Sequence, residues 1–250
     1  MDRDGGPLVA QSGAMRTNDI ARGSRKDVAG VVASSGTSLS PTARTTLHRN
    51  RTRAERDRSA LVDVLDAARI CHLGVMVHGT PLVVPTAFAY DLDGPDREGT
   101  LYLHGSVAAA SLAVEDDVCV SVTVVDGLVL ARSAFHHSMN YRSAVVRGRP
   151  RIVVDTAERD AALALIVDKV VPGRAALLRP NTRKELAATR VLAVALYEAS
   201  VKTRTGGPVD DDEDVAAGGV WAGVLPVTER IGSPVPAADL DAAGAVHAPR

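Results

Sequence analysis

The chain is 250 residues long, with 46% hydrophobic and 24% charged residues and a formal net charge of −1. These are ordinary values for a globular protein of one large or two small domains. The balanced charge gives no overall attraction to nucleic acid or to a membrane surface, so we expect neither as a partner.

Charge is concentrated at the two ends of the chain. Residues 1–58 hold 11 Lys and Arg against 6 Asp and Glu, whereas residues 205–250 hold 2 against 8. Both ends are rich in Gly, Pro, Ser or Asp, which is typical of solvated tails. We therefore expect a disordered tail over residues 1–40, one domain over 41–226 and a flexible tail over 227–250. Met15 is an alternative start to Met1.

The two cysteines and the lack of sorting signals indicate a cytoplasmic protein. Cys71 and Cys119 lie in apolar runs without metal-site spacing, so two reduced, buried thiols are expected rather than one disulfide. No apolar stretch approaches the roughly 20 residues of a membrane-spanning helix. The opening "MDRDGGPLV" lacks the basic start and apolar centre of a secretion signal.

The first half of the domain begins with a basic, extended arm over 41–55, and a helix follows over 57–68. Two β-branched runs on either side of His78, Gly79 and Thr80 predict a hairpin, and a long turn over 91–99 leads to the strand 100–104. We expect a short helix over 105–116, with Ser106 near its start.

The second half is predicted to continue with strands 118–125 and 128–135, joined at Asp126-Gly127, which is a strong hairpin signal. A strand over 141–154 precedes a helix that Asp155 caps and that ends near Val171. A helical piece near 182–188 leads to a last long strand over 190–204. Six or seven strands without βαβ spacing favour a mainly β fold, an antiparallel barrel with helices outside.

Polar groups gather in three segments beside strand ends. His104, Gly105 and Ser106 precede the expected helix at 105–116, so they form an anion site or, more simply, a serine cap. A second corner, "LARSAFHHSMNYRSAVVRG" over 130–148, combines arginines, whose planar fork suits phosphate, with hydroxyl donors. Its candidate residues are Arg132, Ser133, Tyr141, Arg142 and Ser143. A polar loop with surface ion pairs is the alternative for this corner.

The third segment is "VKTRTGGPVDDDED" over 201–214, whose acidic run either binds a divalent cation or faces solvent. No EF-hand spacing is present, so no metal is assigned. The chain also lacks the Gly-rich dinucleotide fingerprint, the phosphate-binding loop of NTPases and the serine elbow of hydrolases.

Several longer strings together resemble one family, the pyridoxamine 5′-phosphate oxidase-like flavin-nucleotide-binding proteins, with the nitroimidazole-resistance reductases as near relatives. The strings are "CHLGVMVHGTPLVVPTAFAYD", "LYLHGS", "VSVTVVDGLVLARSAFHHSMNYRSAVV", "VVPGR" and "VKTRTGGPVDDDED". They cover roughly three quarters of the chain in the family's order.

The resemblance implies a split β-barrel that forms a homodimer and holds FMN in the groove between the subunits. By this resemblance, Val84, Pro85 and Thr86 run beside the flavin ring, and His104, Gly105 and Ser106 line its edge or its phosphate arm. The corner residues Arg132, Ser133, Tyr141, Arg142 and Ser143 complete the cofactor site. His104 is the candidate for proton handling.

The chain departs from the family at Ala109 and Ala110, where relatives carry a Ser-Arg pair that helps to hold the phosphate. Loss of a charged donor weakens binding by about 1.5–3 kcal/mol, which is about ten- to a hundredfold in affinity. Ser111 or the two corner arginines are candidate substitutes. Without a substitute, FMN is bound weakly, or deazaflavin or haem takes its place.

These features favour an FMN-dependent oxidoreductase that acts on a small molecule, with NAD(P)H as a plausible electron donor. The first alternative is a non-catalytic protein that binds or sequesters a flavin, a deazaflavin or haem. The second is a structural dimerisation module with an empty groove.

Overall fold

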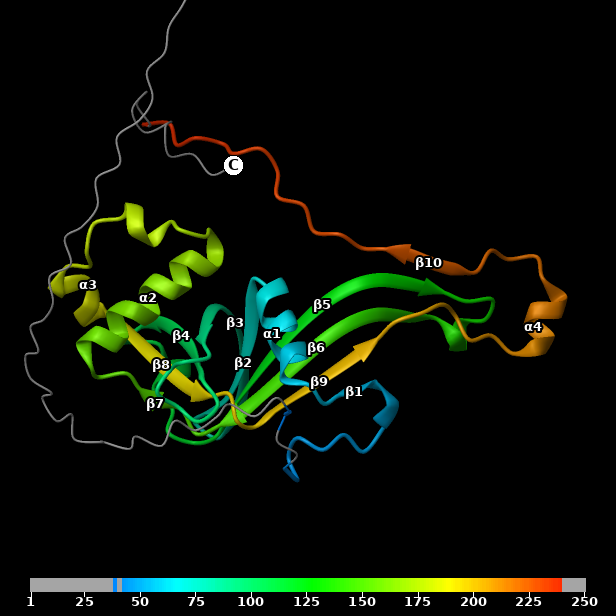
Figure 1. Ribbon diagram of the computed structural model, residues 1–250, viewed down its shortest axis with the longest axis horizontal. Coiled ribbons are helices and arrows are strands. Elements are labelled where there is room, and N and C mark those ends of the chain that lie inside the picture. The colour runs from blue at the N-terminus through cyan, green and yellow to red at the C-terminus, as the bar shows by residue number, and fades with distance from the viewer. Residues whose placement is uncertain (1–37, 40–41, 240–250) are drawn as a thin grey trace, which may run out of the picture. The chain divides into compact units, whose positions relative to one another are not determined.

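Strands dominate the computed structural model, which describes residues 38–39 and 42–239 (Figure 1). The strands are β1 (Ala54–Glu55), β2 (Ile70–Val77), β3 (Thr80–Asp91), β4 (Thr100–Ser106), β5 (Val118–Leu130), β6 (Ser138–Gly148), β7 (Arg151–Ile152), β8 (Thr189–Ala195), β9 (Ala199–Arg204) and β10 (Gly223–Pro226). The α-helices are α1 (Arg58–Ala67), α2 (Thr156–Val170), α3 (Arg183–Ala188) and α4 (Asp212–Ala217). Short 3₁₀ turns are η1 (Arg51–Arg53), η2 (Ala110–Leu112), η3 (Ala134–His136) and η4 (Ala175–Leu177).

All strand pairs in the described residues are antiparallel, and they form one sheet in the order β1-β9-β6-β5-β2-β3-β4-β8-β7, with β10 on β5. β3 joins the two halves of this sheet, because its first part pairs with β2 and its last part with β4. This arrangement is a split β-barrel with flanking helices, which confirms the predicted fold class.

Period-two alternation gives the barrel its interior. On β2, Cys71, Leu73 and Val75 are buried, while His72 and Met76 on the opposite face are exposed. The buried side chains of this strand join those of β5, β6 and α1 in the main hydrophobic core. A second, smaller core lies on the other side of β4 and β8, where α2 packs through residues such as Ala162 and Ile166.

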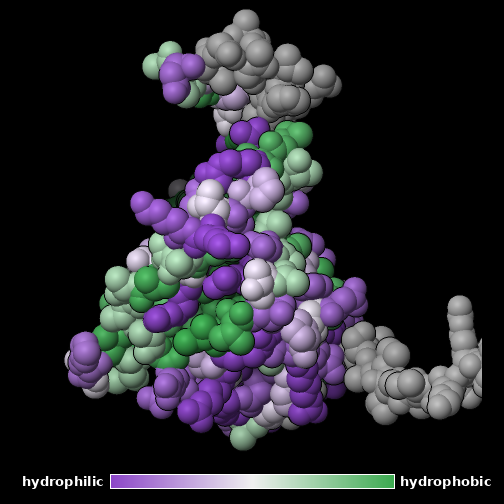
Figure 2. Space-filling view, turned by 90° about the vertical axis from the view of Figure 1, so that its left-hand side faces the viewer, coloured by the Kyte–Doolittle hydropathy of each residue, from purple (hydrophilic) through white to green (hydrophobic). Residues whose placement is uncertain are grey.

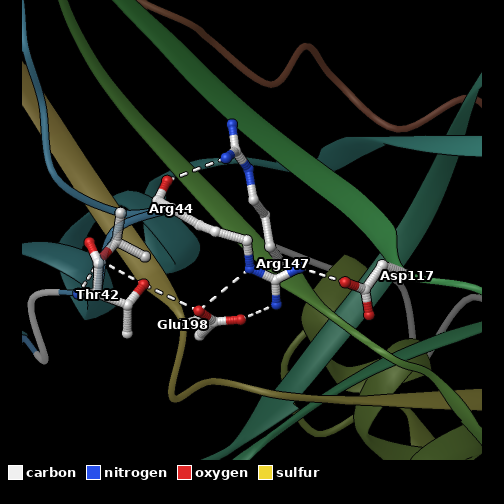
Figure 3. A network of polar contacts seen from close by, with 6 residues as sticks. Thr42, Arg44, Asp117, Arg147 and Glu198 are labelled. Carbon is white, nitrogen blue, oxygen red and sulfur yellow. Dashed lines mark hydrogen bonds and ion pairs between the residues drawn. The ribbon is translucent and has the colours of Figure 1, made fainter.

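A polar network fastens the segment before α1 to the barrel (Figure 3). The guanidinium of Arg44 binds the carboxylates of Glu198 and Asp117, and Thr42 Oγ1 donates to Glu198 at 2.8 Å. Arg147 on β6 donates to the carbonyl of Arg44 at 2.9 Å. The segment over 42–55 is thus folded onto the barrel through a turn at 43–45 and η1, whereas an extended arm was expected.

The predicted hairpin at Asp126-Gly127 is wrong. β5 runs through these residues as one 13-residue strand, and the register shift between Val125 and Gly127 marks a β-bulge. The turn lies at 131–137 instead, before β6. A Cβ on Gly127 would stand 2.9 Å from Val224 Cγ1, so the glycine is needed for the close approach of β10.

Two further elements differ from the prediction. The helix expected over 105–116 is absent: β4 continues to Ser106, and only the 3₁₀ turn η2 follows. The strand expected over 190–204 is divided by a bend at 196–198 into β8, which pairs with β4, and β9, which pairs with β6. The described residues therefore contain ten strands rather than six or seven.

The predicted tails lie largely outside the described residues. This applies to residues 1–37 and 40, with both candidate start residues, and to residues 240–250. Residues 227–239 are described without a helix or strand. Within the part that the structure describes, no helix has the length and apolar character to cross a membrane.

Candidate functional site

The end of β4 brings the segment "HGS" to the rim of the second core. Leu101 and Leu103 point into the barrel, so Tyr102 and His104 face the other side, toward α2. His104 is half-buried and lines a cavity of about 450 Å³. Residues of α2, such as Leu163 and Val167, and residues 175–181 form much of the remaining wall.

The imidazole of His104 is shielded from water and incompletely paired. Its Nδ1 is buried and has no hydrogen-bond partner among the described residues. Burial lowers the pKa of His104, because a charged ring loses hydration in this environment. The ring is therefore neutral near pH 7, and a neutral imidazole suits a hydrogen bond or a metal–nitrogen bond.

Gly105 and Ser106 continue β4 beside β8, opposite Arg190 and Thr189. A Cβ on Gly105 would lie 2.7 Å from Leu112 Cδ1, so the glycine allows η2 to pack against the strand. The Oγ of Ser106 accepts a hydrogen bond from Ala108 N at 3.2 Å. Ser106 thus stabilises a tight turn, and the helix N-terminus on which the predicted anion site depended is absent.

Val84, Pro85 and Thr86 lie on β3, where they pair with Leu73, His72 and Cys71 of β2. Pro85 is exposed, and its two neighbours are half-buried. The hydroxyl of Thr86 donates to the carbonyl of Ala87 at 3.3 Å. The β3–β4 ladder begins at Phe88, opposite Leu103, so this segment approaches the "HGS" end without pairing with it.

Tyr141, Arg142 and Ser143 lie in the middle of β6, with β5 on one side and β9 on the other. Arg142 makes a two-pronged contact with Asp126 at 2.8 and 3.0 Å, and these hydrogen bonds raise its pKa. Arg142 and Asp126 both line an open groove of about 730 Å³, which residues 67–70 and 227–229 complete. Ser143 Oγ makes a long contact with the carbonyl of Lys202 at 3.5 Å.

Arg132 and Ser133 lie in the loop after β5, next to α4 at the far end of the hairpin (Figure 1). The carboxylate of Asp210 accepts hydrogen bonds from Arg132 N at 2.8 Å and from Arg132 Nη1 at 2.7 Å. Burial alone would raise the pKa of Asp210, but these two donors outweigh it and lower the pKa. The Oγ of Ser133 is buried without a partner among the described residues.

Within one chain the predicted site residues form three separate groups: those on β3 and at the end of β4, those on β6, and those in the loop after β5. β5 and β2 lie between β6 and β3, so three strand spacings, about 14 Å, separate Arg142 from the segment 84–86. Arg142 is opposite Val124, whereas Arg132 follows Leu130, about 20 Å further along β5. Each arginine is bound to its own carboxylate, so the two do not converge on one ligand in a single chain. Ser111 lies on η2, half-buried.

The carboxylate partners of these arginines were not predicted as site residues. Asp126 was taken as a turn residue, and Asp210 as part of a solvent-facing acidic run, yet the Asp210 side chain is only 2% exposed. Asp210 is 78 residues from Arg132 in the sequence, so no local pattern signals the pair. The described residues hold no group of three or more His, Cys, Asp or Glu that could bind a metal ion.

Known proteins are similar to this chain in sequence and in fold. The sequence profile described as pyridoxamine 5′-phosphate oxidase matches residues 57–203. A flavocytochrome, Anf3 from Azotobacter vinelandii, is 37% identical with a TM-score of 0.72, over 82% of this chain and 93% of Anf3. An FAD and haem binding protein from Mycobacterium smegmatis is 39% identical with a TM-score of 0.68, over 76% of this chain and 91% of its own. A search of curated proteins finds no match.

Proposed function

Because this chain belongs to the pyridoxamine 5′-phosphate oxidase family, we propose that it is a flavin-dependent oxidoreductase acting on a small molecule. The observation that carries the proposal is His104, which lines a 450 Å³ cavity and whose buried Nδ1 has no partner among the described residues. The exposed part of this half-buried ring lines the cavity, so a ligand bound there contacts the imidazole.

The residues of the cavity fit a flat ring that is apolar on its faces and polar at its edge. Leu163, Val167 and Leu178 supply apolar wall. Arg179 and Asn181 are the polar residues of that part of the wall, where Arg179 binds Glu185 and Asn181 donates to Asp160. The volume is within the range of small-molecule sites. A bound flavin supplies one- or two-electron transfer. His104 orients the ligand through its ring, which also accepts or returns a proton.

FMN is the cofactor that the sequence indicates, and FAD is its nearest competitor. Ala109 and Ala110 bring no side-chain donor to the loop after β4, which is a poor fit to the family's FMN phosphate contact. The M. smegmatis relative is named for FAD, and both relatives are named as haem-containing or cytochrome proteins. Release of the cofactor by denaturation, followed by chromatography against FMN and FAD standards, identifies which one is bound.

Haem is a second candidate group, and the chain could then carry a flavin or haem without turnover. A neutral imidazole with an unpaired nitrogen, such as His104, is a suitable iron ligand. A Soret band in the purified protein, lost in His104→Gln, would support haem at this residue.

The test of the main proposal is turnover. We expect the reconstituted protein to show a flavin absorption band that NADH or NADPH bleaches and that an oxidised substrate or oxygen restores. We also propose that the chain acts as a homodimer, with flavin held between the subunits. Stable colour without reduction would instead support the sequestering protein. A colourless protein whose melting temperature does not change on addition of flavins would contradict both the oxidoreductase and the sequestering protein.

A further inference from the structure

A second, smaller cavity of about 230 Å³ lies on the same side of the sheet as His104. Its wall is formed by Val107 after β4, by residues 152–154 at the end of β7 and just after it, by α3, and by β8. Thr189 lines both this cavity and the cavity of His104, so the two are neighbours. Figure 2 views the molecule from this side and shows hydrophobic residues lying among hydrophilic ones.

Two arginines line the smaller cavity, Arg159 from α2 and Arg190 from β8. Arg159 Nε and Arg190 Nη1 are both buried and have no hydrogen-bond partner among the described residues. Arg132 also has a buried Nε without a partner, but its guanidinium binds Asp210. Arg142 likewise binds Asp126, and Arg151 binds Asp96 and Glu158, whereas neither arginine of this cavity forms an ion pair within the described residues.

The carboxylates nearest to Arg159 in the sequence are engaged elsewhere. Asp155 caps α2 by accepting from Glu158 N at 2.8 Å. Glu158 itself binds Arg151 and accepts from Tyr102 Oη at 3.0 Å. Asp160 accepts from Asn181 at 3.3 Å. No acidic residue lines the cavity, so the positive charge of the two guanidinium groups is not balanced there.

A half-buried cation without a counter-ion is unfavourable, and two such cations in one wall repel each other. An oxyanion removes both penalties, because the planar guanidinium matches phosphate or carboxylate oxygens with paired donors. The remaining wall, including Val153, Leu186 and Val191, is apolar and would exclude water from such a contact.

We propose that Arg159 and Arg190 form a binding site for a phosphate group. The phosphate is either free or part of the flavin nucleotide, which would replace the contact missing at Ala109 and Ala110. Only the second source rests on the proposed function. Val107, two residues before Ala109, lines the cavity and therefore places it beside that loop.

The experiment compares the wild type with the double variant Arg159→Gln and Arg190→Gln. Arg183→Gln on α3 is the matched control, because this arginine is exposed and makes no polar side-chain contact in the described part of the chain. Inorganic phosphate and pyrophosphate are titrated calorimetrically, and dissociation constants are measured for riboflavin, FMN and FAD.

If the phosphate is free, the double variant loses phosphate affinity by about ten- to a hundredfold, while the control is unchanged. If the phosphate belongs to the cofactor, the affinity of the double variant for FMN or FAD falls by the same factor, whereas its affinity for riboflavin is unchanged. In either case its melting temperature without ligand is at least that of the wild type, because two half-buried charges without a counter-ion are removed.

The proposal is overturned if the double variant retains wild-type affinity for all the phosphorylated probes. It is also overturned if that variant melts well below the wild type without ligand, because the arginines would then be structural. A chain that binds no flavin at all would defeat the proposed function alone, since the titrations with phosphate and pyrophosphate still decide this site.

Discussion

The His104 side chain makes the stability of the fold sensitive to pH. Burial lowers its pKa in the folded state below the ordinary value of 6.5, so in mildly acidic solution the unfolded chain binds a proton that the folded chain does not. The free energy of unfolding therefore decreases as the pH falls below about 6.5. Replacement of His104 by Gln should remove this part of the decrease.

Thermal melts of the unliganded protein between about pH 5 and pH 8 measure the effect. His72→Gln is the matched control, because His72 is exposed on the neighbouring strand β2. We expect the curve of His104→Gln to be flatter than that of the wild type. The curve of the control His72→Gln should match that of the wild type. Parallel curves for all three proteins would show that folding does not lower the pKa of His104.

The same substitution tests the role of the ring in cofactor binding. Gln keeps a polar end but cannot place a donor or acceptor where the ring nitrogen lies, so one neutral hydrogen bond to the ligand is lost. We expect flavin affinity to fall by up to about tenfold. Turnover at saturating flavin should fall as well if His104 transfers a proton. An unchanged rate at saturation would limit His104 to binding.

At the scale of elements, β10 depends on the absence of a side chain at Gly127. A Cβ there would lie 2.9 Å from Val224 Cγ1 and 3.2 Å from the carbonyl of Leu225. We expect Gly127→Ala to weaken the β5–β10 pairing at a cost of about 1–3 kcal/mol. Hydrogen exchange should accelerate at 223–226 while the amides between β5 and β6 near Ala144 stay protected. Uniform loss of protection would instead mean that β10 and the barrel unfold together.

The side chain of Arg44 holds the segment before α1 against the barrel (Figure 3). Its carboxylate partners are Glu198 and Asp117, and the hydrogen bonds from Arg44 lower the pKa of Glu198. We expect Arg44→Ala to expose residues 42–57 to proteolysis, whereas Arg49→Ala, at an exposed arginine, leaves cleavage unchanged. The wild type should show the same exposure in acid, once Glu198 is protonated. Equal cleavage of both variants would contradict the role of this network.

Elements whose signals are local were predictable from the sequence. The hairpin at His78 and Gly79 and the cap of α2 by Asp155 depend on neighbouring residues, and both are confirmed. The failures depend on distant partners. At Asp126-Gly127 the strand continues through a bulge, because β6 and β10 both pair with the residues that follow. The run over 190–204 bends because its two halves pair with different strands. The position of "HGS" at a strand end was likewise predictable, whereas the pairing of Arg132 with Asp210 was not.

At the scale of the whole molecule, the outer face of β2 and β3 is uncovered in the single chain. Met76 on β2 and Val83 on β3 point away from the barrel and are 49% and 64% exposed. Uncovered apolar side chains on a regular sheet favour association with another surface. The predicted homodimer would bury them, and it could also bring the separate groups of site residues, on β3 and β6, together across the interface.

Val83→Arg tests this arrangement, because a charge on that face opposes burial against a second copy but is tolerated on an exposed strand. We expect light scattering after size exclusion to show a monomer for this variant and a dimer for the wild type. Val170→Arg at the end of α2, where Val170 is 57% exposed, should remain a dimer. If flavin is held between subunits, Val83→Arg also loses flavin, whereas a monomer that still binds flavin with wild-type affinity would place the whole site within one chain.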